Sequence, residues 1–226
     1  MTYPGNLLYA DRAEAGRVLA SRLSGFLGNP DAIVLALPRG GVPVGFEISR
    51  QLRLPLDLLI VRKLGVPGQE ELAMGAIASG NVLVLNRDVI RKLRIADETI
   101  QQVIARERIQ VARQEQQFRA GPIAEVRNRT LILVDDGLAT GSTMRAAAQT
   151  MRTHCPRSLI VAVPVGPVET CAQLRQEADQ VLCVATPSPF GSVGAFYHIF
   201  NQTTDEEVRA LLERSRDSSS EIRQSA

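Results

Sequence analysis

Short apolar runs alternate along the chain with segments whose apolar residues recur at helical spacing. The runs are rich in Val, Ile, Leu and Ala, which predicts buried β-strands over residues 32–37, 56–61, 82–85, 131–135, 158–163 and 180–185. The helical spacing predicts helices over residues 44–51, 97–119, 142–152 and 168–178. Strands that are apolar on both faces and alternate with helices form parallel sheets covered on both sides. The pattern therefore predicts an α/β fold with a three-layer, parallel-sheet core.

Two further helices are predicted from capping signals, one near each end of the chain. The signals are the pairs Asp11 with Glu14 and Thr204 with Glu207, each ahead of an amphipathic segment. The chain is polar from about Arg216 onward, which predicts a disordered tail over residues 216–226. We therefore expect a single domain over residues 1–215.

One segment, residues 63–80, shows neither the apolar run of a strand nor the apolar spacing of a helix. Residues 63–80 contain several turn-forming residues, namely Gly65, Pro67, Gly68, Gly75 and Gly80. Glycine and proline at this density predict a long mobile loop.

Composition excludes several classes of protein. The chain has 226 residues, of which 45% are hydrophobic and 22% charged, so it can bury a core and is not expected to be disordered. A net charge of +2 gives no reason to expect a nucleic-acid partner. No apolar run approaches the roughly 18 residues of a membrane helix, and residues 1–6 do not resemble a secretory signal. The three cysteines form no CxxC pair, so we expect a reducing, cytoplasmic location.

The strongest chemical signal is the segment 131–143, Leu-Ile-Leu-Val-Asp-Asp-Gly-Leu-Ala-Thr-Gly-Ser-Thr. A buried strand ends there in two carboxylates, Asp135 and Asp136, and a Gly/Thr/Ser loop then opens a helix. The loop offers backbone N–H groups and hydroxyls to a phosphate at the positive end of the helix. The carboxylates suit sugar hydroxyls or the water shell of Mg²⁺. A sugar phosphate would satisfy both halves of the motif.

This segment resembles the phosphoribosyl pyrophosphate (PRPP) binding motif of the type I phosphoribosyltransferases. The resemblance implies that Asp135 and Asp136 hold the ribose hydroxyls and associate with Mg²⁺ through water and PRPP. It also implies that a loop holds the 5′-phosphate, formed here by Ala139, Thr140, Gly141, Ser142 and Thr143.

Two other segments resemble parts of the same family and lie in the expected order. Arg39, Gly40 and Gly41 follow the first strand and look like the pyrophosphate loop, which in the family often carries a non-proline cis peptide. Arg62 and Lys63 open a stretch similar to the flexible catalytic loop of adenine phosphoribosyltransferases. Lys63 is one of only two lysines in the chain, which favours a role for it over a solvated surface position. The resemblance assigns Lys63, Arg39, Asp135 and Asp136 to catalysis.

The resemblance further implies a core over about residues 30–188 and a small hood formed by residues 1–29 and 189–215. Phe190 and Tyr197 lie in the aromatic-rich segment after the last strand, where the family builds its hood. Stacking of a planar base on these rings and packing of the rings within the hood are both open. Ala139 stands where hypoxanthine-type enzymes have an Asp, which favours a purine-like acceptor of adenine type. The adenine-type Glu late in the flexible loop has no counterpart in residues 76–80.

We therefore expect a Mg²⁺-dependent transferase that moves the phosphoribosyl group of PRPP to a small nitrogen nucleophile and releases pyrophosphate. The alternative is a regulatory protein of the same fold that binds PRPP or a nucleotide with little catalysis. The intact Lys63 segment favours the enzyme. The oligomeric state is open, with a homodimer as one alternative.

Overall fold

The computed structural model describes residues 8–118 and 124–224 of the chain. A parallel sheet of five strands forms its centre, in the order β2-β1-β6-β7-β8. The strands are β1 (Ala32–Ala36), β2 (Leu56–Leu58), β6 (Thr130–Val134), β7 (Ser158–Val165) and β8 (Gln180–Ala185). This sheet confirms the predicted α/β fold.

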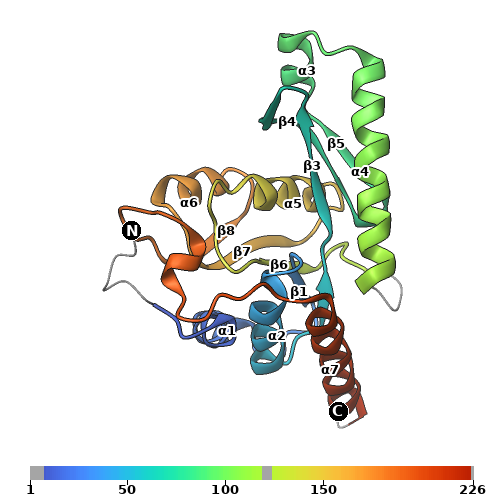
Figure 1. Ribbon diagram of the computed structural model, residues 1–226. Coiled ribbons are helices and arrows are strands. Elements are labelled where there is room, and N and C mark those ends of the chain that lie inside the picture. The colour runs from blue at the N-terminus through green and yellow to red at the C-terminus, as the bar shows by residue number, and fades with distance from the viewer. Residues whose placement is uncertain (1–7, 119–123, 225–226) are drawn as a thin grey trace.

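Helices cover both faces of the sheet, as Figure 1 shows. The helices of one face are α1 (Arg12–Arg22) and α2 (Gly41–Leu52), and those of the other are α5 (Ser142–Arg152) and α6 (Val168–Leu174). Alternate strand residues face opposite helices because successive side chains of a strand point to opposite sides. Val34 and Ile132 pack with Ile48 of α2, whereas Leu35 and Leu133 pack in the core that contains α5. This double burial explains why the strands are apolar throughout.

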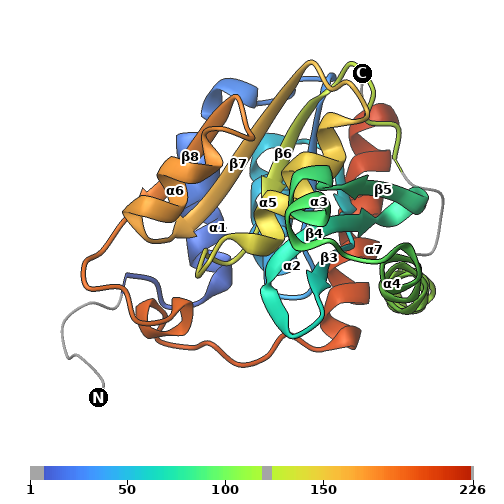
Figure 2. The same ribbon diagram turned by 90° about the horizontal axis from the view of Figure 1, so that it is seen from above.

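A second lobe rises from the edge of the sheet that carries β2 (Figure 1). It consists of an antiparallel sheet with strands β3 (Val61–Val66), β4 (Gln69–Ala78) and β5 (Val82–Leu85), followed by α3 (Arg87–Leu93) and α4 (Asp97–Phe118). Leu64, Met74 and Ile77 of the sheet pack with Ile100 and Ile104 of α4 in a core of their own. Seen from above, the turn between β3 and β4 projects toward the side where the parallel strands end (Figure 2).

The prediction of a mobile loop over residues 63–80 is therefore wrong. Gly65 lies within β3 and Gly75 within β4 rather than in a loop. Gly75 has no room for a side chain, because a Cβ there would collide with the carbonyl oxygen of Val84 on the neighbouring strand β5. Gly68, with φ +78°, forms the turn. The predicted strand 56–61 is also divided, since β2 ends at Leu58 and β3 begins in the other sheet at Val61.

The two ends of the described chain meet beside the sheet. Tyr9 and Tyr197 form a parallel bridge, and the amides of Leu8 and His198 donate to the carbonyls of Phe196 and Tyr9. The two segments predicted to form a hood thus lie in contact, although residues 1–7 lie outside the described part. Both capping signals are confirmed, because Asp11 accepts from the Glu14 amide and Thr204 from the Glu207 amide.

Short 3₁₀ helices and one long terminal helix complete the chain. The 3₁₀ helices span Ser24–Phe26, Ser79–Asn81 and Val193–Phe196. The last helix, α7 (Asp205–Gln224), packs Val208 and Leu212 against Val42 of α2 and Leu58. Its backbone remains helical through residues 216–224, where the polar composition predicted a disordered tail. Across the described residues, no helix has the length and apolar character needed to cross a membrane.

The close approach of β4 and β5 generates a prediction. Gly75→Ala places a Cβ against the Val84 carbonyl, so we expect the lobe to lose about 1–3 kcal/mol of stability, the usual cost of overpacking. Hydrogen exchange should show faster exchange of the β4 and β5 amides, and urea unfolding should begin at lower denaturant. Gly25→Ala is the matched control, because a Cβ there meets nothing within 4 Å. Equal protection of the lobe in both variants would contradict the packing described here.

Candidate functional site

The candidate site lies where β1 and β6 end next to each other. Ala36 of β1 pairs with Val134 of β6, and the Leu37 amide donates to the Val134 carbonyl at 2.9 Å. The segment 38–41 and the acidic residues 135–136 therefore leave the sheet side by side. The carboxyl ends of parallel strands are the usual place for ligands in such sheets.

Glycines allow the segment 38–41 to lie directly against the acidic residues. A Cβ on Gly40 would collide with Oδ2 of Asp136, and one on Gly41 would lie 2.6 Å from the Val134 carbonyl oxygen. The peptide bond between Pro38 and Arg39 is cis, a feature that the resemblance implied for this loop. Because α2 begins at Gly41, the loop also lies at the positive end of a helix.

Asp135 and Asp136 form a closely spaced pair of half-buried carboxyl groups. The Asp136 amide donates to Oδ1 of Asp135 at 2.9 Å. Burial, followed by the charge of Asp136, raises the pKa of Asp135 well above its ordinary range. Burial also raises the pKa of Asp136, although a hydrogen bond from Arg12 lowers it. A pair in this environment gains from a bound cation or from hydroxyl donors.

Arg12 is a site residue that the sequence interpretation missed. Its Nε donates to Oδ2 of Asp136 at 2.8 Å, and the two side chains are 12% and 15% exposed. Its Nη1 donates to the carbonyl of Asn201, and its guanidinium lies 3.9 Å from the centre of the Phe200 ring. The only local signal was a charged residue immediately after a helix cap, which does not identify a partner.

The segment 139–143 forms a turn that leads into α5. Gly141, with φ +69°, caps the helix, and the hydroxyls of Thr140 and Ser142 lie 3.0 Å apart. Thr170 of α6 supports the turn from behind, since its hydroxyl donates to the Ala139 carbonyl at 3.2 Å. Thr140 and Thr143 are exposed. The arrangement presents hydroxyls at a helix N-terminus, as an anion site requires.

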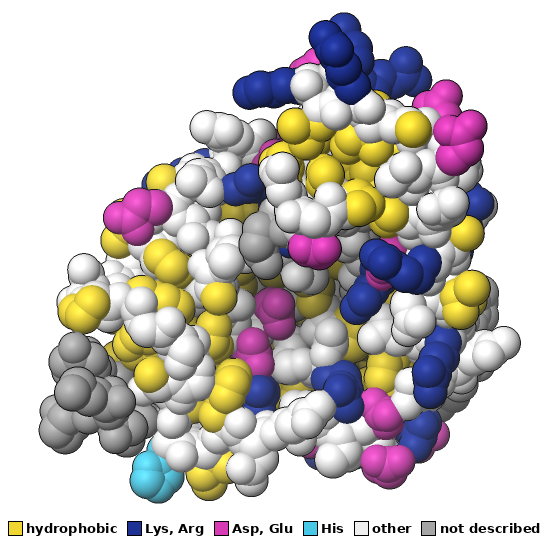
Figure 3. Space-filling model, turned by 45° about the horizontal axis from the view of Figure 1, so that its top comes forward, with side chains coloured by type: hydrophobic (Ala, Val, Ile, Leu, Met, Phe, Trp, Pro, Cys, Tyr) yellow, Lys and Arg dark blue, Asp and Glu magenta, His cyan; other side chains and the backbone are white. Residues whose placement is uncertain are grey.

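An open cavity of about 350 Å³ joins the core to the lobe. It is lined by Leu37, Pro38, Leu59, Val61, Arg62, Lys63, Gln114 and Thr143. The structure thus brings Arg62 and Lys63 together with both loops of the core. Figure 3 shows acidic side chains near the centre of this face, below the lobe, with Lys or Arg side chains around them.

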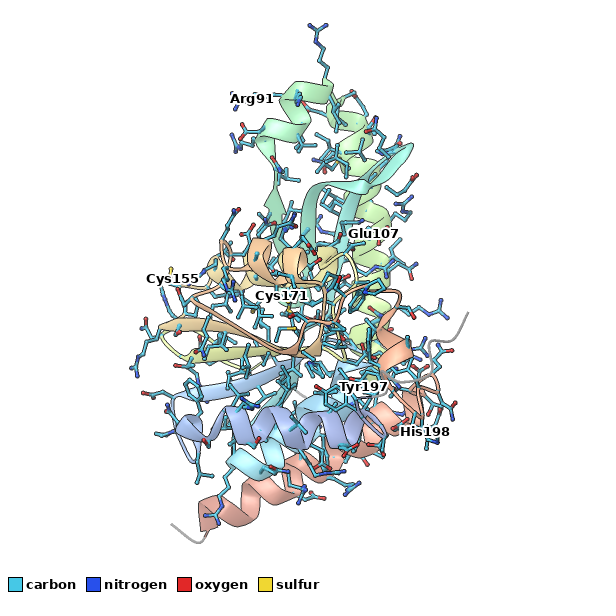
Figure 4. The ribbon with its side chains drawn as sticks, turned by 90° about the vertical axis from the view of Figure 1, so that its left-hand side faces the viewer. Arg91, Glu107, Cys155, Cys171, Tyr197 and His198 are labelled. Atoms are coloured by element: carbon cyan, nitrogen blue, oxygen red, sulfur yellow. The ribbon has the colours of Figure 1, made fainter. Side chains whose placement is uncertain are left out.

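Arg62 is held by a buried acidic residue of the lobe. Its Nε donates to Oε2 of Glu107 at 3.0 Å, and Nε of Arg106 donates to Oε1 at 2.9 Å. The Glu107 side chain is 7% exposed and extends from α4, where Figure 4 labels it. A buried carboxylate with two guanidinium partners is well compensated. It fixes Arg62 at the cavity wall.

Arg39 extends toward the start of the last helix. Its Nη1 is 3.4 Å from Oδ1 of Asp205, the first residue of α7, and its side chain is 40% exposed. Asp205 also accepts a hydrogen bond from Gln117 of α4. From the start of α7, Asp205 therefore contacts both Arg39 of the loop and Gln117 of the lobe.

The two aromatic residues predicted to stack on a base differ in exposure. Tyr197 is 3% exposed, its hydroxyl donates to the Asp136 carbonyl at 2.6 Å, and its ring packs against Tyr9 and Phe200. This burial does not fit a stacking role and instead makes Tyr197, which Figure 4 labels, a support for the backbone of Asp136. Phe190 is half-buried, and its ring centre lies 5.2 Å from that of Phe196.

Comparisons with known proteins agree on one family. A family model described as "Phosphoribosyl transferase domain" matches residues 8–194. Proteins from two strains of Mycobacterium tuberculosis, both named as phosphoribosyl transferases, are 46% identical over 209 residues, which is 92% of this chain and 47% of each relative. This chain spans about half the length of the curated relatives it matches. The crystal structure of TT1426 from Thermus thermophilus is 40% identical with a TM-score of 0.83, and the match covers 91% of this chain and 98% of that one.

The raised pKa of Asp135 predicts how stability depends on pH. Folding disfavours the charged form, so the carboxylate destabilises the fold at neutral pH, and this cost disappears as falling pH protonates the folded protein. Asp135→Asn should therefore raise Tm at pH 7, by about 2–4 °C for each kcal/mol gained. The gain should shrink as the pH approaches about 4, the ordinary range of a carboxyl group.

Asp179→Asn is a control of opposite sign. Hydrogen bonds from Arg152 lower the pKa of Asp179, so this substitution should reduce Tm at neutral pH, with a smaller effect in acid. Thermal melts across the pH range check both variants. A pH-independent Tm difference for Asp135→Asn would contradict the electrostatic description of the pair.

Proposed function

This chain belongs to the phosphoribosyl transferase domain family, and we propose that it transfers the phosphoribosyl group of PRPP to a nitrogen nucleophile and releases pyrophosphate. The observation that carries the proposal is the meeting of four features at one edge of the sheet. They are the acidic pair 135–136, the loop 139–143, the loop 39–41 and the cavity with Lys63. Each suits one part of PRPP.

The residues divide the substrate between them. Asp135 and Asp136 accept hydrogen bonds from the ribose hydroxyls, and the loop 139–143 binds the 5′-phosphate at the N-terminus of α5. Arg39, with the amide of Gly40, binds the diphosphate from the side of α2, and Gly41, whose own amide donates to the Leu37 carbonyl, allows the loop to lie close to the acidic pair. Arg62 and Lys63 approach the diphosphate from the lobe. The substrate is then held at its 5′-phosphate, at its ribose hydroxyls and at the diphosphate on C1, which fixes the position of C1.

The reaction replaces one bond at the ribose C1 by another. The nitrogen forms a bond to C1 while the bond from C1 to the diphosphate oxygen breaks. The electron pair of the broken bond leaves with pyrophosphate, which also takes up the proton lost by the nitrogen. Positive charge develops on the ribose and negative charge on the leaving group. The carboxylates stabilise the first and the cationic side chains the second, so the protein acts by positioning and electrostatics. The turn of the β3–β4 hairpin projects toward this edge of the sheet (Figure 2).

The acidic pair fits a magnesium ion held mainly by substrate. Within the described ranges, no group of three or more His, Cys, Asp or Glu side chains could hold a metal alone. Mg²⁺ commonly keeps several waters and binds through one or two carboxylates together with substrate phosphates. Asp135 and Asp136 would hold it in this way, and the ion would neutralise charge on the diphosphate.

We propose a planar nitrogen base, of purine-like character, as the acceptor. Phe190 supports this choice because its half-buried ring lies in the hood segment that follows β8. Tyr197 contributes indirectly, by fixing the backbone of Asp136.

Binding of PRPP tests the proposed function. Titration calorimetry should show that PRPP binds, more tightly with Mg²⁺, and that a panel of bases and amines includes one that releases pyrophosphate. Asp135→Asn combined with Asp136→Asn should weaken PRPP binding at least about tenfold, since each hydrogen bond to a charged group contributes about 1.5–3 kcal/mol. Unchanged affinity in the double variant would contradict the proposal. Tight binding without pyrophosphate release across the panel would instead favour the regulatory function.

Lys63 provides a separate test of catalysis. Lys63→Ala should lower kcat by about 10²–10³, the usual loss when one electrostatic donor to the transition state is removed. PRPP affinity should fall much less. Lys92→Ala is the matched control, because Lys92 is the only other lysine and is exposed on α3. If both variants keep full kcat, Lys63 is not part of the reaction.

A further inference from the structure

Arg12 occupies a position that its own helix does not favour. It is the first residue of α1, directly after the cap Asp11. The N-terminus of a helix carries partial positive charge, so a cation there is unfavourable and an exposed arginine would turn toward solvent. The side chain instead is only 12% exposed. A specific partner must compensate for both its position and its burial.

Three contacts from other elements provide that compensation. Oδ2 of Asp136 accepts from Nε at 2.8 Å, the Asn201 carbonyl accepts from Nη1 at 2.7 Å, and the Phe200 ring lies 3.9 Å from the guanidinium carbon. Phe200 is itself fixed, because its ring packs directly against Gly194. A Cβ at that glycine would lie only 2.7 Å from the ring carbon Cδ1. The guanidinium is thus held by the hood and by the acidic pair together.

The contact with Asp136 selects one of its two carboxylate oxygens. Oδ2 receives the Arg12 donor and lies against Gly40, whereas Oδ1 is farther from that glycine. The Tyr197 hydroxyl fixes the Asp136 carbonyl from the C-terminal hood segment. Side chain and backbone of Asp136 are therefore both oriented from the hood.

Arg12 also changes the charge of the pair. Two adjacent carboxylates in a half-buried site repel each other, and an unpaired one is costly. With Arg12 present, the pair and its partner carry a net charge of about −1 when both acids are ionised. Both carboxylates can then remain in place before any ligand arrives.

We propose that Arg12 is a positioning residue that orients Asp136 to accept a hydrogen bond from a ribose hydroxyl. The inference rests on the proposed function, and it assigns to the hood a role in holding the sugar. It makes the N-terminal and C-terminal segments parts of the sugar site, although neither carries a residue of the acidic motif. Asn201 and Phe200 act through Arg12, and Arg12 acts through Asp136.

Two ligands that share a phosphate separate this role from general stability. Ribose 5-phosphate carries the sugar hydroxyls, whereas inorganic phosphate offers no sugar hydroxyl to the acidic pair. Arg12→Gln should weaken ribose 5-phosphate binding about tenfold, equivalent to one hydrogen bond to a charged group, and change inorganic phosphate binding by less than about twofold. Arg12→Lys should recover part of the affinity, because an ammonium can pair with Asp136 but does not present the planar donors that also reach Asn201.

Arg152→Gln is the matched control. Arg152 also pairs with an aspartate, Asp179, at 2.7 Å, but on the surface at the far end of α5. Arg152→Gln should leave the binding of ribose 5-phosphate and of inorganic phosphate unchanged. Equal loss of both ligands in Arg12→Gln, or no loss of ribose 5-phosphate, would overturn the proposal. If Arg12→Gln does not fold, Arg12→Lys is the deciding variant. We expect it to lose less affinity, and to lose it for ribose 5-phosphate alone.

Binding of ribose 5-phosphate to the unmodified protein distinguishes a failure of the proposed function from a failure of the role proposed for Arg12. If the unmodified protein binds no ribose 5-phosphate, the proposed function fails, and the role of Arg12 is then decided by a crystal structure of Arg12→Gln. We expect Oδ2 of Asp136 to leave its place against Gly40 in that structure. A carboxylate that stays in the same orientation would show that Arg12 does not position it.

Discussion

The site is organised around two adjacent carboxyl groups that are partly removed from water at the end of a buried strand. Isolated, this pair would be unfavourable, because burial and mutual repulsion both oppose ionisation. The surrounding structure reduces the cost of burying these two carboxyl groups. Glycines let a neighbouring loop approach, Arg12 supplies a compensating charge, and Tyr197 fixes the backbone. Each of these contacts comes from residues far from the pair in sequence. The glycine loop lies close because β1 and β6 are neighbours in the sheet, whereas Arg12 and Tyr197 come from the two end segments that meet beside it.

The lobe contributes the second half of the site by a similar arrangement. Glu107 is buried in α4, and its two arginine partners compensate its charge. One of them, Arg62, is thereby held at the wall of the cavity that Lys63 also lines. The lobe thus brings cationic side chains to an opening that borders the two loops beside the acidic pair, through Pro38 and Thr143. Such an arrangement suits a substrate with a hydroxyl-bearing sugar at one end and a diphosphate at the other.

The sequence predicted the parts of this structure that depend on neighbouring residues. The parallel strands follow from apolar runs, and the acidic pair and the loop 139–143 follow from their place directly after one of them. The lobe was missed because its hairpin contains glycines at positions of close backbone approach, which in sequence are indistinguishable from loop glycines. Arg12 was missed because its partner lies 124 residues away, a pairing that no local pattern encodes. The burial of Tyr197 could not be predicted either, since it depends on packing with Tyr9 at the other end of the chain.

We infer that one edge of the sheet holds a sugar phosphate, with the acidic pair on the sugar and the loop 139–143 on the phosphate. A crystal structure of the protein with ribose 5-phosphate tests this arrangement. We expect ribose hydroxyls within hydrogen-bond distance of the Asp135 and Asp136 carboxylates, and phosphate oxygens at the amides and hydroxyls that begin α5. A ribose 5-phosphate bound elsewhere, or bound with its phosphate away from this loop, would contradict this arrangement.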